Sequence, residues 1–157
     1  MITLGIDPSG TTGCGYGVFD GRHVQAYDRD PCLTTDACAV EGPWAGPMGK
    51  VSMWGLGFDA AWRLCEAEAE RKFILKPKEW RAQWPRLANQ ALPGAVIVGR
   101  LRQDLVAAGY APWAVVDGWT HDMVEAAGIA VALHRLLTTP GPKGKPWRPR
   151  KGCEVKR

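Results

Sequence analysis

The sequence predicts a mixed α/β fold, in which one β-sheet is flanked by α-helices. Short apolar runs separated by Gly, Pro and Asp fill the first forty residues, as expected of paired strands. Later segments carry apolar residues at helical spacing, with one further strand between them. At 157 residues, with 46% apolar and 23% charged residues, the chain has the size and composition of one globular domain.

The first part of the chain is expected to form a hairpin-rich sheet. Pro8–Gly13 is a turn rich in Gly, Ser and Thr, and Asp20-Gly21 is a strong two-residue hairpin signal. Apolar or alternating residues between these turns predict four strands, at Ile2–Asp7, Cys14–Phe19, Arg22–Asp28 and Ala37–Val40.

The second part is expected to be mainly helical. A Gly/Pro-rich loop over Gly42–Gly49 precedes it, and Thr120 is a suitable N-cap for the last helix. The predicted elements are a helix from about Val51, a strand at Phe73–Leu75, and helices at Pro77–Trp84, Ala95–Ala108 and from Thr120 to about Leu137.

Residues 138–157 differ from the rest in composition, with four prolines, three glycines and clustered cations. From Lys143 onward there are seven basic residues and one acidic residue, so this end carries +6 while residues 1–142 sum to −2. We therefore expect a folded domain over residues 1–137 and a basic, disordered tail over 138–157.

Several classes of protein are disfavoured by composition. The sequence has no run of roughly 18 apolar residues, as a membrane span needs, and it begins without a signal-peptide core. Its five cysteines form no Cys-x-x-Cys pair, which argues against a zinc site or a disulfide framework. We expect a cytoplasmic protein with reduced thiols.

Four carboxylates stand where chemistry is usually presented in α/β folds. Asp7 and Glu41 each close an apolar strand, and Asp122 and Glu125 lie on one face of the last helix, in its first turn. Alone, Asp7 could accept hydrogen bonds in an Asx-turn, and the helical pair could serve only the helix dipole. Together, they predict a site where a divalent cation assists phosphoryl transfer.

Four stretches resemble the RuvC family of Holliday-junction resolvases, especially its short phage-type members. They follow the family's order and cover most of residues 1–137. The resemblance implies an RNase H-like fold and a homodimeric, Mg²⁺-dependent endonuclease that cuts symmetric strands of a four-way DNA junction, in a bacterial cell or a phage-infected host. The stretches are GIDPSGTTGCGYGVFDG at 5–21, VEGPW at 40–44, KPKEWR at 76–81 and HDMVEAAGIAVALH at 121–134.

The resemblance assigns the catalytic and metal-binding roles to Asp7, Glu41, Asp122 and Glu125. Mg²⁺, or Mn²⁺ in its place, suits such an oxygen-only set of ligands. Two ions roughly 3.5–4 Å apart would bridge the scissile phosphate. Glu125 departs from the family, where an aspartate is more usual.

Aromatic and basic residues are the candidates for DNA contact. Trp44 is expected either to wedge into the junction, by the resemblance, or to cover the sheet edge, whereas Trp54, Trp62 and Trp113 are expected in the core. Basic side chains could bind phosphates or simply be solvated. The candidates are Lys50, Lys76, Lys78 and Arg81, and in the tail Lys143, Lys145, Arg148, Arg150 and Lys151.

Other functions remain open at this point. His121 could orient a water or phosphate, or could be only an exposed first-turn residue. The same fold could serve a nuclease for flaps, replication forks or RNA–DNA hybrids. Alternatively, the chain could be a non-catalytic protein that binds branched DNA.

Overall fold

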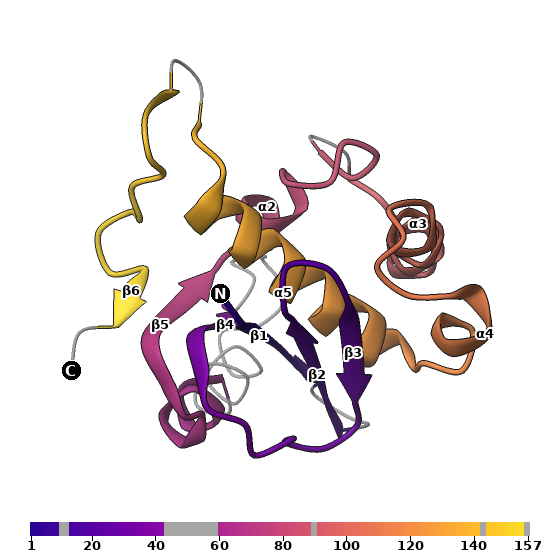
Figure 1. The fold of residues 1–157 in the computed structure, drawn as a ribbon, viewed down its shortest axis with the longest axis horizontal. Helices are drawn as coiled ribbons and strands as arrows, with labels where there is room; N and C mark the ends of the chain where they lie inside the picture. Colours follow the sequence, from indigo (N-terminus) through magenta and orange to yellow (C-terminus); the bar gives the residue numbers. More distant parts are fainter. Residues whose placement is uncertain (10–12, 43–59, 89–90, 142–143, 156–157) are drawn as a thin grey trace.

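The computed structural model describes residues 1–9, 13–42, 60–88, 91–141 and 144–155 (Figure 1). Their core element is a six-stranded sheet with the order β3-β2-β1-β4-β5-β6. The strands β1 to β3 form an antiparallel meander, β4 and β5 run parallel to β1, and β6 is antiparallel to β5. Their bounds are Thr3–Ser9 (β1), Gly13–Phe19 (β2), Val24–Tyr27 (β3), Thr35–Glu41 (β4), Ala69–Leu75 (β5) and Glu154–Val155 (β6).

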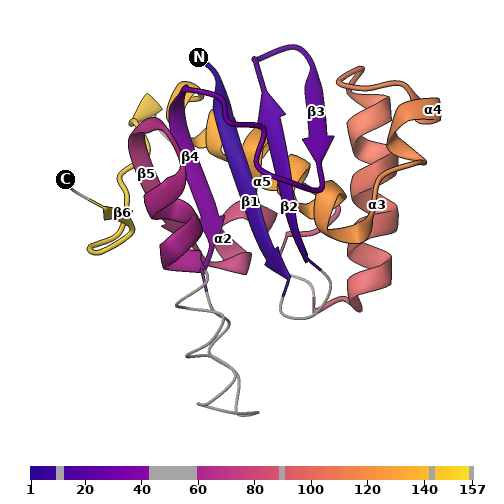
Figure 2. The same ribbon diagram turned by 90° about the horizontal axis from the view of Figure 1, so that it is seen from below.

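Helices pack on the sheet, and the long helix α5 crosses it behind β1 and β2 (Figure 2). The helices are α2 (Pro77–Arg81), α3 (Gly94–Ala107), α4 (Trp113–Val116) and α5 (His121–Thr138). Residues 60–66 are also helical, while the predicted start of that helix at Val51 lies outside the described residues. Within the described ranges, no helix is long and apolar enough to cross a membrane. This mixed sheet flanked by helices confirms the predicted α/β fold class.

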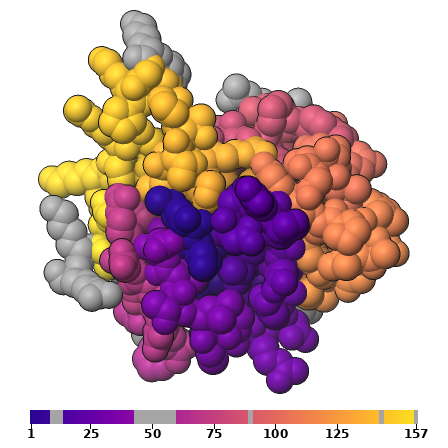
Figure 3. Space-filling view, viewed as in Figure 1, coloured from indigo at the N-terminus to yellow at the C-terminus, as the bar shows by residue number. Residues whose placement is uncertain are grey.

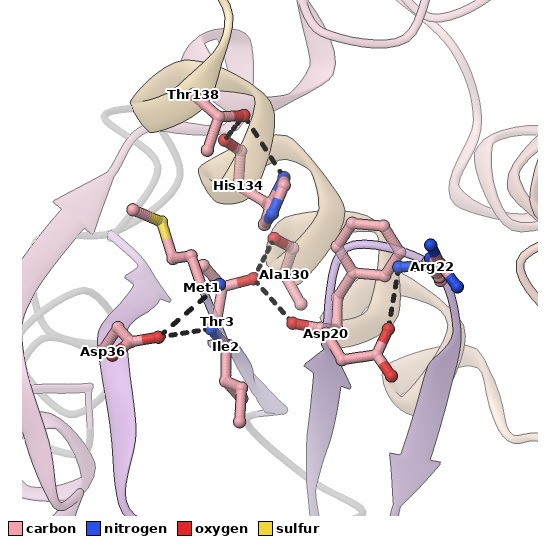
Figure 4. Close-up of polar contacts among 10 residues, drawn as sticks. Met1, Ile2, Thr3, Asp20, Arg22, Asp36, Ala130, His134 and Thr138 are labelled. Carbon is pink, nitrogen blue, oxygen red and sulfur yellow. Dashed lines mark hydrogen bonds and ion pairs between the residues drawn. The ribbon is translucent and has the colours of Figure 1, made fainter.

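The two faces of β1 bury different side chains, because successive residues of a strand point to opposite faces. Leu4 and Ile6 pack with Leu64, from the helical residues 60–66, in one apolar cluster. On the other face, the Thr3 hydroxyl donates a hydrogen bond to the Ala130 carbonyl oxygen of α5 at 2.9 Å (Figure 4). Gly5 and Asp7 follow Thr3 at alternate positions and thus share the α5 face.

Glycines on this face bring α5 unusually close to the sheet. A Cβ on Gly5 would lie 2.2 Å from the Ala126 carbonyl oxygen, and one on Gly15 would lie 2.0 Å from that of Asp122. Gly17 is equally close to the helix backbone. Real side-chain carbons do not approach backbone atoms this closely, so glycine is required for α5 to sit where it does.

Some elements differ from the sequence prediction. β5 begins at Ala69 rather than Phe73, because charged residues at 70–72 lie at exposed or half-buried positions of a true strand. α2 ends at Arg81 rather than Trp84, and the short helix α4 was not predicted. The connection between β3 and β4, residues 28–34, contains no helix.

The C-terminal segment, residues 144–155, packs beside β5 instead of extending as the predicted disordered tail. Its Trp147 ring lies 5.6 Å from the Phe73 ring, and Arg150 pairs with Glu79 at 2.8 Å. Figure 3 shows this segment (yellow) and α3–α4 (orange) on opposite sides of the N-terminal strands. Apolar residues among the cations supply the contacts that the composition of the tail did not reveal.

The tryptophans are also distributed differently from the prediction. Trp62 and Trp113 were expected in the core, but they are 57% and 50% exposed. Trp80 and Trp84 are fully buried instead. Trp54 lies outside the described residues. The periodicity of a short helix indicates which residues share a face but not which face meets the sheet.

Candidate active site

Asp7 and Glu41 meet at one edge of the sheet because their strands are parallel neighbours. β1 and β4 are in register through the pair Ile6 and Val40, so the next residue of each strand emerges at the same edge. Asp7 is 6% exposed, and Glu41 is half-buried. The carboxyl ends of parallel strands are where α/β folds place ligands.

The start of α5 brings the other two acids to this edge, with Asp122 in the first turn and Glu125 just after it rather than in that turn as predicted. The Thr120 side chain caps the helix by accepting a hydrogen bond from the Met123 amide at 3.2 Å. Asp7 lies opposite Gly15 in the sheet, and Gly15 is where the backbone of Asp122 comes closest. The structure therefore gathers all four predicted acids, with Asp122 and Glu125 half-buried.

Burial raises the pKa of Asp7 well above its ordinary value, and the negative charges of Glu125, Glu41 and Asp122 raise it further. A direct interaction with the Glu125 side chain adds to this rise in the pKa of Asp7. A carboxyl group that ionises with such difficulty indicates a site that lacks sufficient positive charge.

Burial also raises the pKa values of the two glutamates. That of Glu125 reaches about 7, with a further contribution from the charge of Glu41, while Arg81 opposes the shift. For Glu41, the effect of burial is opposed by Arg81 and by the Trp80 hydrogen bond. The cluster therefore holds fewer negative charges at neutral pH than its four carboxyl groups suggest.

A basic residue lies among the acids. Arg81, at the end of α2, places Nη2 3.8 Å from Oε1 of Glu41 and 3.8 Å from Oε1 of Glu125. The preceding Trp80 donates from its indole nitrogen to Oε1 of Glu41 at 3.3 Å. Sequence reasoning assigned Arg81 to DNA phosphates and missed Trp80 entirely. The signals available in the sequence were the KPKEWR motif and a helix that starts at Pro77 directly after a strand.

The residues fit a divalent metal by their chemistry but not by their present arrangement. Carboxylate oxygens are the ligands that Mg²⁺ and Mn²⁺ prefer. In the part of the chain that the structure describes, however, no three Asp, Glu, His or Cys side chains are placed to hold one ion together. The guanidinium of Arg81 takes up the position between Glu41 and Glu125.

The remaining predicted residues occupy two regions. Lys76 and Lys78 are exposed at the start of α2, and His121 is exposed at the start of α5. In the C-terminal segment, Arg150 is held by Glu79 and by the Ile74 carbonyl oxygen. Lys145 lines a cavity beside the end of α5, and Arg148 and Lys151 are exposed. Trp44, Lys50 and Lys143 lie outside the described residues.

No protein-family model matches this chain, and no curated protein matches it. Two solved structures of RuvC from Thermus thermophilus are similar to it. The first has a TM-score of 0.49 and 17% identity, covering 84% of this chain and 92% of that one. The second, RuvC in complex with a Holliday junction substrate, has a TM-score of 0.46 and 16% identity with the same coverage. At these values the likeness carries no argument about activity, which rests on the residues of the site.

Proposed function

We propose that this protein is a divalent-metal-dependent endonuclease that cleaves four-way DNA junctions. The observation that carries the proposal is the convergence of Asp7, Glu41, Asp122 and Glu125 at one edge of the sheet. A cluster of acids at buried and half-buried positions costs free energy unless a cation offsets it, because each ionised carboxylate loses hydration and repels the others.

The proposed chemistry assigns a separate task to each part of the site. Asp7 and Glu41, fixed on strand ends, and the two acids of α5 supply oxygen ligands from three directions. Bound Mg²⁺ would lower the pKa of a water for attack and would stabilise the leaving oxygen. The hydrogen bond from Trp80 to Glu41 would help to order this ligand before DNA binds.

The choice of junction DNA is supported by the sequence motifs and by the charges around the site. Lys76 and Lys78 project from α2, next to Arg81, where they could contact phosphates beside the acids. Cleavage of symmetric strands requires two active sites, so we propose a homodimer. In this proposal Trp44 enters the opened centre of the junction. Membership of the phage-type group stays a prediction from the motifs.

Two other functions are kept as alternatives. A nuclease for flaps, forks or RNA–DNA hybrids would use the same acids on a different substrate. A non-catalytic protein that binds branched DNA is favoured by one observation, that no three metal ligands are in place among the described residues. It would leave the acids permanently neutralised by protons and by Arg81.

The proposal is tested with Asp7→Asn and Glu41→Gln, assayed with Mg²⁺ on a labelled four-way junction. We expect both variants to lose nicking and to keep junction binding in a gel-shift assay, because each change removes a metal ligand while preserving shape. Glu70→Gln, at an exposed position of β5, is the matched control and should cleave like the unmodified protein.

The substrates are compared side by side in the same assay. Faster cutting of flaps or hybrids than of junctions would replace the proposed substrate. Equal cutting by Asp7→Asn and the unmodified protein would reject the catalytic assignment. Junction binding without any cleavage in Mg²⁺ or Mn²⁺ would favour the non-catalytic alternative.

A further inference from the structure

Arg81 occupies the place among the acids that a metal cation would need. Its Nη2 atom is equidistant, at 3.8 Å, from an oxygen of Glu41 and an oxygen of Glu125. These two acids come from different elements, β4 and α5, so the guanidinium links the two sides of the site. A cation bound by these two glutamates would compete with the guanidinium for the same two oxygens.

The contacts of Arg81 are those of a loosely held cation. At 3.8 Å, Nη2 is too far from either carboxylate for a hydrogen bond, so attraction between the charges is what holds it. Its Nε atom is buried and has no acceptor among the described residues. The guanidinium carbon lies 5.3 Å from the centre of the Trp80 ring, which supports it on one side. A buried donor without an acceptor costs free energy. Moving the guanidinium out of this arrangement therefore costs less free energy than breaking a bidentate ion pair.

We propose that Arg81 is the resident counter-cation of the metal-free site, and that binding of a divalent cation displaces it. Two cations on the same pair of glutamates repel each other and compete for the same oxygens. Because coupling between two bound groups is reciprocal, a guanidinium that stabilises the empty site must weaken metal binding to the same extent. Arg81 thus sets the metal affinity and keeps the four acids gathered before the metal arrives.

This inference rests on the proposed function in one respect, namely that the acids bind a divalent cation at all. It adds that the geometry for metal binding forms only when Arg81 moves. The absence of a ready-made set of three ligands in the described structure is the expected state of such a site.

The test measures Mn²⁺ binding without DNA, by calorimetric titration of Arg81→Gln, Arg81→Lys and the unmodified protein. Couplings between two ligands of one protein are usually about 5- to 150-fold, so we expect Arg81→Gln to bind Mn²⁺ at least about fivefold more tightly. Arg81→Lys keeps the charge and should stay closer to the unmodified protein. Arg29→Gln is the matched control, since it removes one positive charge from a side chain that is 89% exposed, between β3 and β4, and should change the affinity less.

A second measurement follows Arg81 in the unmodified protein, and a variant serves only to assign its signal. The Nε–Hε signal of Arg81 in a ¹⁵N NMR spectrum, assigned by comparison with Arg81→Lys, should move when Mg²⁺ is added. A signal that stays in place at saturating Mg²⁺ would overturn the inference, as would unchanged or weaker Mn²⁺ binding by Arg81→Gln.

The two proposals fail in different ways. If all variants bind Mn²⁺ equally well, the displacement of Arg81 is wrong while the metal site stands. If neither the unmodified protein nor Arg81→Gln binds Mn²⁺, both the displacement and the metal-dependent function are rejected.

Discussion

Replacing Gly15 with alanine should push the start of α5 away from the sheet. The new Cβ would lie 2.0 Å from the Asp122 carbonyl oxygen, whereas ordinary contact begins at 3.4 Å, so the helix must retreat by about 1.4 Å. Overpacking of this kind costs about 1–3 kcal/mol. In a chain of this size, each kcal/mol lowers the midpoint of thermal unfolding by about 2–4 °C, so we expect a fall of about 2–12 °C.

The same displacement should damage the site more than the fold. Asp122 lies in the first turn of α5 and Glu125 just after it, so their distance from Asp7 changes with the position of the helix. A misplacement of about 1 Å in a catalytic group can cost about 100-fold in rate. We therefore expect weaker Mn²⁺ binding and strongly reduced junction cleavage from Gly15→Ala, even where the protein remains folded.

The assay pairs thermal unfolding with Mn²⁺ titration, and Gly99→Ala serves as the control. No described atom lies within 4 Å of the Cβ that this change adds on α3, and alanine is the better helix former by about 1 kcal/mol. The two glycine replacements should thus shift stability in opposite directions. If Gly15→Ala unfolds and binds Mn²⁺ like the unmodified protein, the close seating of α5 is refuted.

Two further predictions concern the charges and hydrogen bonds of the site. Burial, and then the charge of Glu41, raise the pKa of Glu125 from 4.5 to about 7, so its ionisation is disfavoured in the folded protein. The free energy of unfolding without metal should therefore fall as pH rises from about 4.5 through 7. This one group should account for up to about 3 kcal/mol of the fall. Added Mg²⁺ should reduce that fall, and an unfolding temperature that rises across this pH range would contradict the shift. Trp80→Phe removes the indole N–H that Glu41 accepts, so we expect a loss of about 1.5–3 kcal/mol in denaturant unfolding and weaker Mn²⁺ binding. Unfolding and titration curves identical to those of the unmodified protein would show that this hydrogen bond does not matter.

The acids could be predicted from the sequence because their positions follow from simple rules of strand and helix ends. Asp7 and Glu41 each come directly after a run of buried residues, and parallel strands bring their ends to one edge. Asp122 and Glu125 share a helical face because they are three residues apart. These arguments need no knowledge of side-chain packing.

The role of Arg81 could not be predicted, because it depends on how a five-residue helix sits over the sheet. The motif around it indicated only a basic, partly aromatic segment after a strand. For the position of α5, a signal was present in the alternating glycines Gly15 and Gly17 of β2, which mark the face where a helix backbone approaches. The low strand propensity of glycine explains why glycines are rare in sheets. It does not explain these glycines, which are needed because α5 leaves no room for a Cβ.

The seating of α5 on the first two strands has a consequence for biosynthesis. Thr3 and Ala130, which hydrogen-bond across this contact, are 127 residues apart in sequence. Contacts this distant form late, and a ribosome adds only about 5–20 residues per second. The glycine face of the emerging sheet must therefore stay uncovered for several seconds. We expect prematurely terminated polypeptides that lack α5 to carry Asp7 and Glu41 without the other two acids of the site.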